Sequence, residues 1–186
     1  QVLSMKENSE KRFKIKVAFF KGSRKSLLHR FIRWYTKSPY SHAELILPDG
    51  ETWAGISPFL TATVSERKKT ISEKDEELNT WDYLTFMLNW REPVRKYKVS
   101  QLNKFIKKTM GSRYDWVGVV LSNITPFLVK KRDKWYCSEW IAHALVNSRI
   151  VMWDDVNLYD TPNLSPGKLY DLLLDHAVPE IDNESR

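Results

Sequence analysis

The sequence has a single cysteine, Cys137, among its 186 residues. No disulfide can form within the chain, so the fold does not depend on an oxidising compartment. Long apolar runs are also missing: the most apolar stretch, residues 116–129, is interrupted by polar residues and proline and is shorter than the roughly 20 residues that span a bilayer. The first twelve residues show no apolar signal core. We therefore expect a soluble protein made in the cytosol, without a transmembrane segment or signal peptide; delivery elsewhere by another route stays open.

Several motifs that carry chemistry are absent from the sequence. It has no GxSxG elbow, no phosphate-binding glycine-rich loop and no dinucleotide-binding fingerprint. Three of the four histidines, His29, His143 and His176, form no metal-ligand spacing with Asp or Glu. These absences disfavour a serine hydrolase, a nucleotide enzyme and a zinc enzyme, and we expect neither a cofactor nor a bound metal.

Size and composition indicate one folded domain. Apolar residues make up 42% of the chain and aromatic residues 13%, which is enough for a substantial core. We predict a flexible basic arm at residues 1–12, a single domain at 13–178 and a polar tail at 179–186.

The net charge of +7 is unevenly distributed. Residues 1–41 carry eleven Lys and Arg against two acids, whereas residues 150–186 carry eight acids against two bases. A basic amino-terminal region suits an anionic partner such as nucleic acid, a phospholipid surface or a cell-wall polymer. The alternative is a solvated face that only keeps the protein soluble. No recognition motif accompanies the charge, so nucleic acid is the partner we expect least.

Hydrophobic periodicity predicts a mixture of strands and helices. The expected strands are 13–20, 41–47 and 51–54, and the expected helices are 26–37, 100–110, 114–121, 134–147 and 167–175. Residues 81–88 fit either a strand or a helix, and short strands at 61–64 and 69–71 are one interpretation of the region 55–80. Because strands and helices do not alternate regularly, we expect an α+β fold with an antiparallel sheet.

The predicted helix at 26–37 is amphipathic. One face carries apolar residues, and the other face is mostly basic. The apolar residues are Leu27, Leu28, Phe31, Ile32 and Tyr35, and the basic ones are Arg30, Arg33 and Lys37.

Cys137 lies at the start of a predicted helix. First-turn amides and the helix dipole stabilise an anion there, and the thiolate is the nucleophilic form of cysteine. The alternative is a small buried hydrophobe, which is the commoner role of a free cysteine.

His42 begins a predicted strand in which His42, Glu44 and Ile46 share one face. A histidine and a glutamate on a shared face suit a base held against a thiol with a carboxylate nearby. The alternative is a strand with one wet face, on which both side chains are ordinary surface residues.

Three segments together resemble a known superfamily. SPYSHAELIL (38–47) precedes a DG turn, GSRYDWVG spans 111–118, and KWYCSEWIAHAL spans 134–145. They are similar to the circularly permuted branch of the NlpC-type papain-like superfamily, which includes lecithin:retinol acyltransferase-like proteins and bacterial and phage cysteine hydrolases. The resemblance covers roughly residues 13–145. It implies a papain-like sheet packed against the helix that bears the cysteine.

The resemblance also implies roles for particular residues. Cys137 would attack an acyl carbon, His42 would take its proton, and the Cys137 N–H would help to form an oxyanion hole. The family often has a third polar residue on the strand after the histidine, but that strand here reads ETWAG, with Glu51 as its only acid. We prefer Glu44 as the third member, with Glu51 or a simple Cys–His pair as alternatives.

Aromatic residues near these motifs are candidates for lining a substrate groove, with plain core packing as their alternative role. They are Tyr40, Trp53, Tyr114 and Trp116, with Asp115 beside them.

Three functions stay open. The first is a thiol amidase or peptidase acting on a peptide or another acyl substrate, cell-wall peptides included. The second is a catalytically inert binding or structural module, as in a phage component, on the same fold. The third is a nucleic-acid binder that uses the basic amino-terminal region. A lipid acyltransferase or phospholipase would use the same thiol chemistry as the first.

Overall fold

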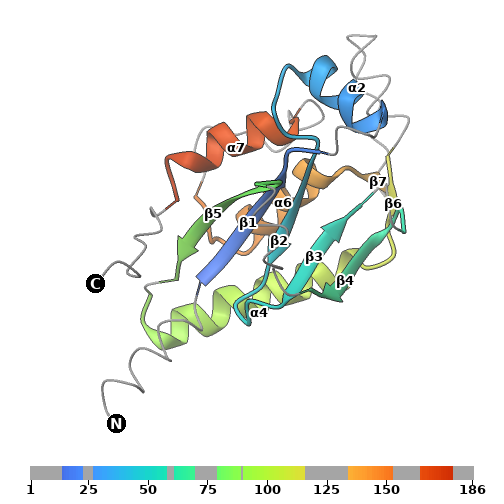
Figure 1. Ribbon diagram of the computed structural model, residues 1–186. Coiled ribbons are helices and arrows are strands. Elements are labelled where there is room, and N and C mark those ends of the chain that lie inside the picture. Colours follow the sequence, from blue (N-terminus) through green and yellow to red (C-terminus); the bar gives the residue numbers. More distant parts are fainter. Residues whose placement is uncertain are drawn as a thin grey trace.

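Five antiparallel strands form the central sheet of the computed structural model (Figure 1). The structure describes residues 14–22, 27–57, 61–69, 79–88, 90–115, 134–152 and 164–177, apart from the side chains of Leu28 and Tyr35. The strands are β1 (Lys14–Phe20), β2 (His42–Ile46), β3 (Thr52–Ile56), β4 (Val64–Lys68) and β5 (Trp81–Met87). Their order in the sheet is β4-β3-β2-β1-β5, so β2 lies at the centre.

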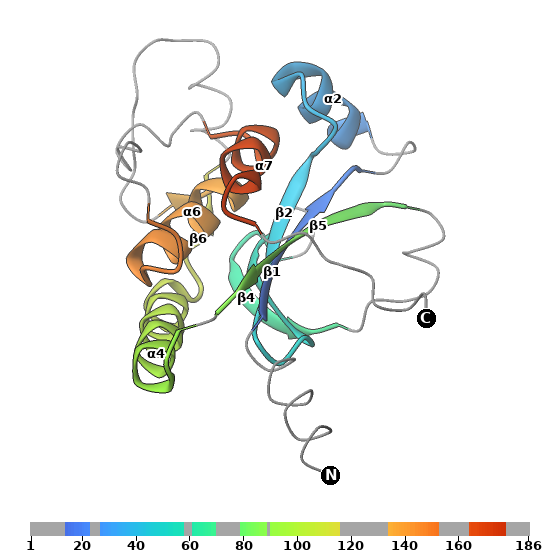
Figure 2. The same cartoon turned by 90° about the vertical axis from the view of Figure 1, so that its left-hand side faces the viewer.

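Three helices cover one side of this sheet (Figure 2). They are α4 (Glu92–Thr109), α6 (Cys137–Asn147) and α7 (Pro166–Leu174). The helix α2 (Leu27–Thr36) lies elsewhere, beyond the ends of β1 and β2 in both views. Two short parallel strands, β6 (Arg113–Tyr114) and β7 (Lys134–Trp135), lead from α4 and into α6.

The core lies between the sheet and α6. Alternation along β1 and β2 turns one set of apolar side chains toward the helices, where α6 buries its own apolar side chains against them. That set includes Val17, Phe19, Ala43, Leu45, Trp140, Ile141 and Leu145, all fully buried. A smaller cluster of Ala18, Ile46 and Trp53 occupies the other face of the sheet. His42 and Glu44 alternate with Ala43 and Leu45, so they belong to the Ile46 face.

The predicted α+β class with an antiparallel sheet is confirmed. The strands predicted at 13–20, 41–47 and 51–54 form, and residues 81–87 take the strand alternative rather than the helix. In place of short strands at 61–64 and 69–71, a single strand runs over Val64–Lys68. The predicted arm and tail lie outside the described residues.

Three predicted helix starts are wrong. Tyr114 belongs to a strand, where it pairs with Trp135, and does not begin a helix. The helix predicted from residue 134 begins instead at Cys137, because Tyr136 before it is extended, with φ −114° and ψ 163°. In addition, α4 begins at Glu92 rather than at residue 100, with Pro93 in its first turn, where the missing N–H costs nothing.

Within the described residues, no helix combines the length and apolar character needed to cross a bilayer.

Candidate functional site

The amino end of β2 places His42 beside its neighbours. His42 pairs with Phe20 of β1, and Ser41 donates its N–H to the Phe20 carbonyl at 2.8 Å. The chain leaves β1 at Gly22, whose φ of +85° favours glycine. A Cβ there would lie 2.8 Å from the Ser41 hydroxyl oxygen, so the absent side chain also permits this close approach.

His42 and Glu44 form a buried pair. The imidazole Nε2 lies 2.9 Å from Glu44 Oε1, and the two residues are only 3% and 2% exposed. The alternative that they are ordinary surface residues is therefore wrong. Because Glu44 occupies Nε2, Nδ1 is the ring nitrogen left for a second partner.

Arg67 holds the far side of the Glu44 carboxylate. Its guanidinium donates two hydrogen bonds, from Nη1 to Oε2 at 2.5 Å and from Nη2 to Oε1 at 2.9 Å. Arg67 comes from β4 and reaches Glu44 on β2 across β3, where Gly55 lies in the intervening strand. A Cβ on Gly55 would lie 3.5 Å from Glu44 Cγ, so a larger side chain would compete for the space that the guanidinium uses.

Charge and hydrogen bonding decide the ionisation of Glu44. Burial by itself raises the pKa of this carboxyl. The hydrogen bonds and positive charges of His42 and Arg67 outweigh burial and hold the pKa below its ordinary value. Glu44 is therefore a carboxylate near neutral pH, although almost no water reaches it.

Cys137 is the second neighbour of His42. Burial tends to lower the pKa of His42, but hydrogen bonds and charge interactions with Cys137 and Glu44 outweigh it and raise the pKa to about 9. The thiol and the imidazole therefore interact, and the thiol helps to keep the imidazole protonated. The pairing of β2 with β3 covers Leu45–Ala54 and Ile46–Trp53, and His42 lies beyond it, where α6 begins.

The helix start adds donors to this arrangement. Cys137 is the first residue of α6, and the first-turn N–H groups of a helix have no acceptor within the helix itself. Such groups favour negative charge on the thiol or on a nearby oxygen. The site therefore combines a thiol, an imidazole, a carboxylate bonded to the imidazole and an arginine bonded to the carboxylate.

The thiol and imidazole are closed to a large ligand in this conformation, since Cys137 and His42 are each 3% exposed. A substrate carbonyl reaches the sulfur only if the surrounding chain opens.

The structure separates the two candidate third members. Glu51 is exposed in the turn between β2 and β3, and its Oε2 lies 4.0 Å from Lys68 Nζ. Glu44 is therefore the acid that meets His42.

The predicted groove residues have different surroundings. The Tyr40 hydroxyl donates to Asp82 Oδ2 at 2.6 Å, and its ring packs on Phe19 and Tyr170 with centroids 5.3 and 4.9 Å away. Trp53 is fully buried on the other face of the sheet. Trp53 therefore has the core packing that was its alternative role. Tyr40 is buried too, but it also lines a hollow of about 340 Å³ between the end of α2 and α7.

Tyr114 lies near the thiol. Burial, followed by interaction with Cys137, raises the pKa of Tyr114 well above its ordinary value. Asp115 donates its N–H to the Trp135 carbonyl at 2.8 Å, which fastens β6 to β7. Trp116 lies outside the described residues.

Arg67 and the His29–Ser41 contact were missing from the sequence interpretation. His29 Nδ1 and Ser41 Oγ share a hydrogen bond of 2.8 Å next to His42. Burial, the His42 charge and Arg33 lower the pKa of His29. Alternation in VSERK marks a strand, but only the register of β4 on β3 brings Arg67 to Glu44.

The described residues hold no group of three or more His, Cys, Asp or Glu side chains that could bind a metal ion. Neither protein-family models nor curated proteins give a match to this chain.

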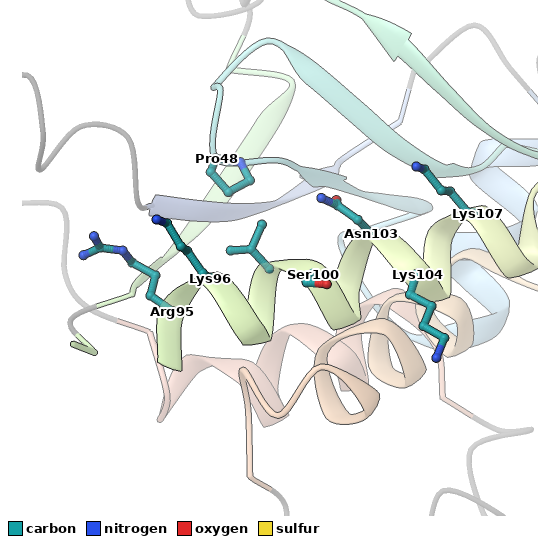
Figure 3. Close-up of a pocket in the computed structure, with 8 residues that line it drawn as sticks. Pro48, Arg95, Lys96, Ser100, Asn103, Lys104 and Lys107 are labelled. Carbon is teal, nitrogen blue, oxygen red and sulfur yellow. The ribbon is translucent and has the colours of Figure 1, made fainter. Parts of the chain in front are cut away.

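A separate groove of about 570 Å³ runs along α4 (Figure 3). It is lined by Pro48, Arg95, Lys96, Val99, Ser100, Asn103, Lys104 and Lys107. None of these residues belongs to the site around Cys137, so this groove is not its substrate cleft.

Proposed function

We propose that this chain is a cysteine-dependent hydrolase that cleaves an amide bond in a peptide substrate, with cell-wall peptides among the candidate substrates. The observation that carries the proposal is the position of His42, which is hydrogen-bonded to Glu44 and whose raised pKa reflects interaction with both Glu44 and Cys137. A base between a thiol and a carboxylate is the arrangement that activates a nucleophile.

The proposed reaction has two steps. His42 holds the proton in the resting site, and the sulfur of Cys137 attacks the acyl carbon of the substrate. When the carbon–nitrogen bond breaks, the leaving amine takes the proton from His42 and a thioester remains on Cys137. His42 then takes a proton from water, the hydroxide attacks the thioester, and the acid product leaves with the thiol restored.

Glu44 and Arg67 act as positioning residues in this proposal. The carboxylate fixes the orientation of the imidazole and favours its protonated form, and the guanidinium keeps the carboxylate charged and in place. The amide N–H of Cys137 would donate to the oxyanion that forms on the substrate.

The order of elements supports a papain-like fold of the permuted NlpC type. The strand with the histidine precedes the helix with the cysteine, and α6 packs on the central strands of an antiparallel sheet. We propose this finer assignment together with the function, since both depend on the same pairing of β2 with α6.

A catalytically inert binding module is the second candidate, and the burial of Cys137 favours it. A lipid-directed thiol enzyme would use the same residues with a different acyl substrate.

Alkylation of Cys137 by iodoacetamide tests the proposal. We expect Cys137 of the parent chain to be labelled in the native state. In His42→Gln the labelling rate should be at least about tenfold lower, because the variant removes the base. His143→Gln is the matched control, since that histidine lies on α6 and packs on Trp135 instead, with ring centroids 4.9 Å apart. It should label at the parent rate.

A different result would contradict the proposal. If Cys137 is labelled only on global unfolding, and if His42→Gln does not change the labelling rate, the thiol is inert and the chain is better described as a binding module. Loss of labelling in both histidine variants would indicate a structural effect and not a base.

A further inference from the structure

Helix α2 exposes three large apolar side chains in one stripe. Leu27, Phe31 and Trp34 are 78%, 54% and 75% exposed. Their spacing of four and three residues places them on one face of the helix. The Phe31 and Trp34 rings lie 6.1 Å apart, so the two form a continuous surface. A helix of a folded domain ordinarily buries its large apolar side chains, and α2 leaves these three exposed.

The opposite side of α2 attaches the helix to the sheet. His29 is 7% exposed, bonds Ser41 at 2.8 Å and packs edge-on against Phe20, with ring centroids 5.2 Å apart. Ile32 and Thr36, at helical spacing from His29, are half-buried on the same side. These contacts hold one side of α2 against the sheet, and the exposed stripe of Leu27, Phe31 and Trp34 lies on the opposite side of the helix.

Cations flank the stripe. Arg30 and Lys37 are exposed, Arg33 is half-buried, and the three follow one edge of the apolar face at helical spacing. The helix itself, LLHRFIRWYT, contains no acidic residue. The face thus combines aromatic and aliphatic side chains with positive charge.

We propose that α2 is an interfacial docking helix whose partner is an anionic phospholipid surface. Short helices with Trp, Phe and Leu on one face and Arg or Lys beside them lie in the plane of a bilayer interface, with the apolar side chains among the acyl chains and the cations at the head groups. Nucleic acid would engage the cations but would leave the aliphatic part of the stripe in water. The charge of the flank therefore complements lipid phosphate, and the stripe complements the bilayer interior.

The basic groove on α4 lacks this combination (Figure 3). Arg95, Lys96, Lys104 and Lys107 line it, and Lys96 already pairs with Glu92 at 2.6 Å. The groove presents cations without a comparable aromatic stripe. Variants of its lysines therefore show how much vesicle binding comes from electrostatic attraction alone.

Docking through α2 would bring the end of the molecule that carries Cys137 and His42 to the lipid, because α2 is attached through Ser41, the residue before His42. This consequence depends on the proposed function, whereas docking itself does not.

Vesicle sedimentation tests the proposal on the full chain. The probes are vesicles of phosphatidylcholine alone and of phosphatidylcholine mixed with phosphatidylserine. We expect binding to the mixed vesicles that salt weakens, and a partition coefficient at least about tenfold lower when Leu27, Phe31 and Trp34 are replaced together by Gln. The matched control replaces Tyr97, Met152 and Leu174 by Gln, since these are 52%, 64% and 50% exposed elsewhere, and it should bind like the parent chain.

Charge variants separate the two basic surfaces. Arg30→Gln with Lys37→Gln should weaken binding to the mixed vesicles, whereas Lys104→Gln with Lys107→Gln should leave it within about twofold, because only the first pair borders the stripe. Equal losses in both would overturn the proposal in favour of diffuse electrostatic attraction.

A site-specific probe keeps the test independent of the thiol chemistry and of any misfolded variant. In a Cys137→Ser chain, an environment-sensitive fluorophore on Trp34→Cys should shift to the blue with mixed vesicles, and one on Tyr97→Cys should not. Absence of a blue shift in the emission of the fluorophore at position 34 would show that lipid is not the partner. The same conclusion would follow if the stripe variant lost self-association or nucleic-acid binding but bound vesicles as the parent chain does. Vesicle binding by α2 does not depend on the reactivity of Cys137, so a negative alkylation test would not contradict it.

Discussion

Raising the pH through about 9 removes the proton that joins His42 to Glu44 and Cys137, and we expect the fold to lose stability in that window. The folded pKa of His42 lies above the ordinary value of 6.5. A raised pKa means that the folded state binds the proton more tightly than the unfolded state does. The stabilisation is therefore complete below pH 6.5 and is lost as the pH rises from there through about 9.

The magnitude follows from the two pKa values. The gap between 6.5 and about 9 corresponds to about 3 kcal/mol, since each pKa unit is worth about 1.4 kcal/mol. A domain has a free energy of unfolding of only about 5–15 kcal/mol, so this loss is readily measurable. The His42 side chain is 4% exposed, which means that solvent screening reduces the value little.

Urea unfolding followed by tryptophan fluorescence, repeated over this pH range, measures the effect. We expect the free energy of unfolding of the parent chain to fall by about 3 kcal/mol across the window and that of His42→Gln to stay much flatter. The variant retains every other group that titrates there, so the difference between the two curves isolates His42. In Cys137→Ala the decline should be smaller and should end at lower pH, because one of the two partners that raise the His42 pKa is gone.

Parallel curves for the parent chain and His42→Gln would refute this reasoning. So would an NMR titration in which the His42 imidazole loses its proton at or below pH 6.5, since burial would then have outweighed both hydrogen bonds. The acid side carries the opposite sign: Glu44 has a lowered pKa, so its stabilisation is present above its ordinary value of 4.5 and is lost as the pH falls through the folded value.

Three further predictions concern the neighbours of this pair. Arg67→Met should lower the free energy of unfolding by about 2 kcal/mol, because Glu44 loses a bidentate partner; Arg67 is 32% exposed, so water replaces it in part. Urea titration measures this loss, and an unchanged unfolding midpoint would contradict the pairing of Arg67 with Glu44. Gly55→Val should lower the free energy of unfolding by about 1–2 kcal/mol and disturb the Arg67–Glu44 pair. Gly55→Ala should be nearly neutral in the same urea titration, because its Cβ would make an ordinary 3.5 Å contact with Glu44 Cγ. Trp140→Phe should cost about 1 kcal/mol in thermal unfolding through the lost 2.9 Å hydrogen bond to Thr109, and an equal loss in Thr109→Val would support that assignment.

Local patterns were enough to predict β2 and the shared face of His42 and Glu44. Alternation fixes which side chains of a strand share a face, so two residues that are two apart can meet without knowledge of the rest of the fold. Apolar spacing likewise predicted the body of α6, with Ile141 and Leu145 in the core. It did not predict where that helix begins, because Lys134 and Trp135 are compatible with helix until the pairing of β6 with β7 competes for them.

Other features depend on strand register and on contacts between elements, which no single segment of the sequence specifies. Arg67 reaches Glu44 only because β4 pairs with β3 so that Arg67 lies opposite Trp53. The exposure of Leu27 and Phe31 was equally hidden, since an amphipathic sequence predicts that a helix has an apolar face but not what covers it. The polar residues of the first two turns of α4 gave no periodic signal, although the structure extends the helix through them.

The energetics of the buried charges favour a functional role over a purely structural one. Desolvating Glu44 and His42 costs several kcal/mol, and apolar residues of similar volume commonly stabilise a core as well or better. The arrangement nevertheless places Glu44, His42, Arg67 and the Cys137 thiol in one connected set. Perturbed titratable groups around a nucleophile are characteristic of active sites, where the polar set is retained for chemistry. Because the thiol is almost fully buried, the labelling rate of native Cys137 measures how often the surrounding chain opens, and the proposed function needs that opening to admit a substrate.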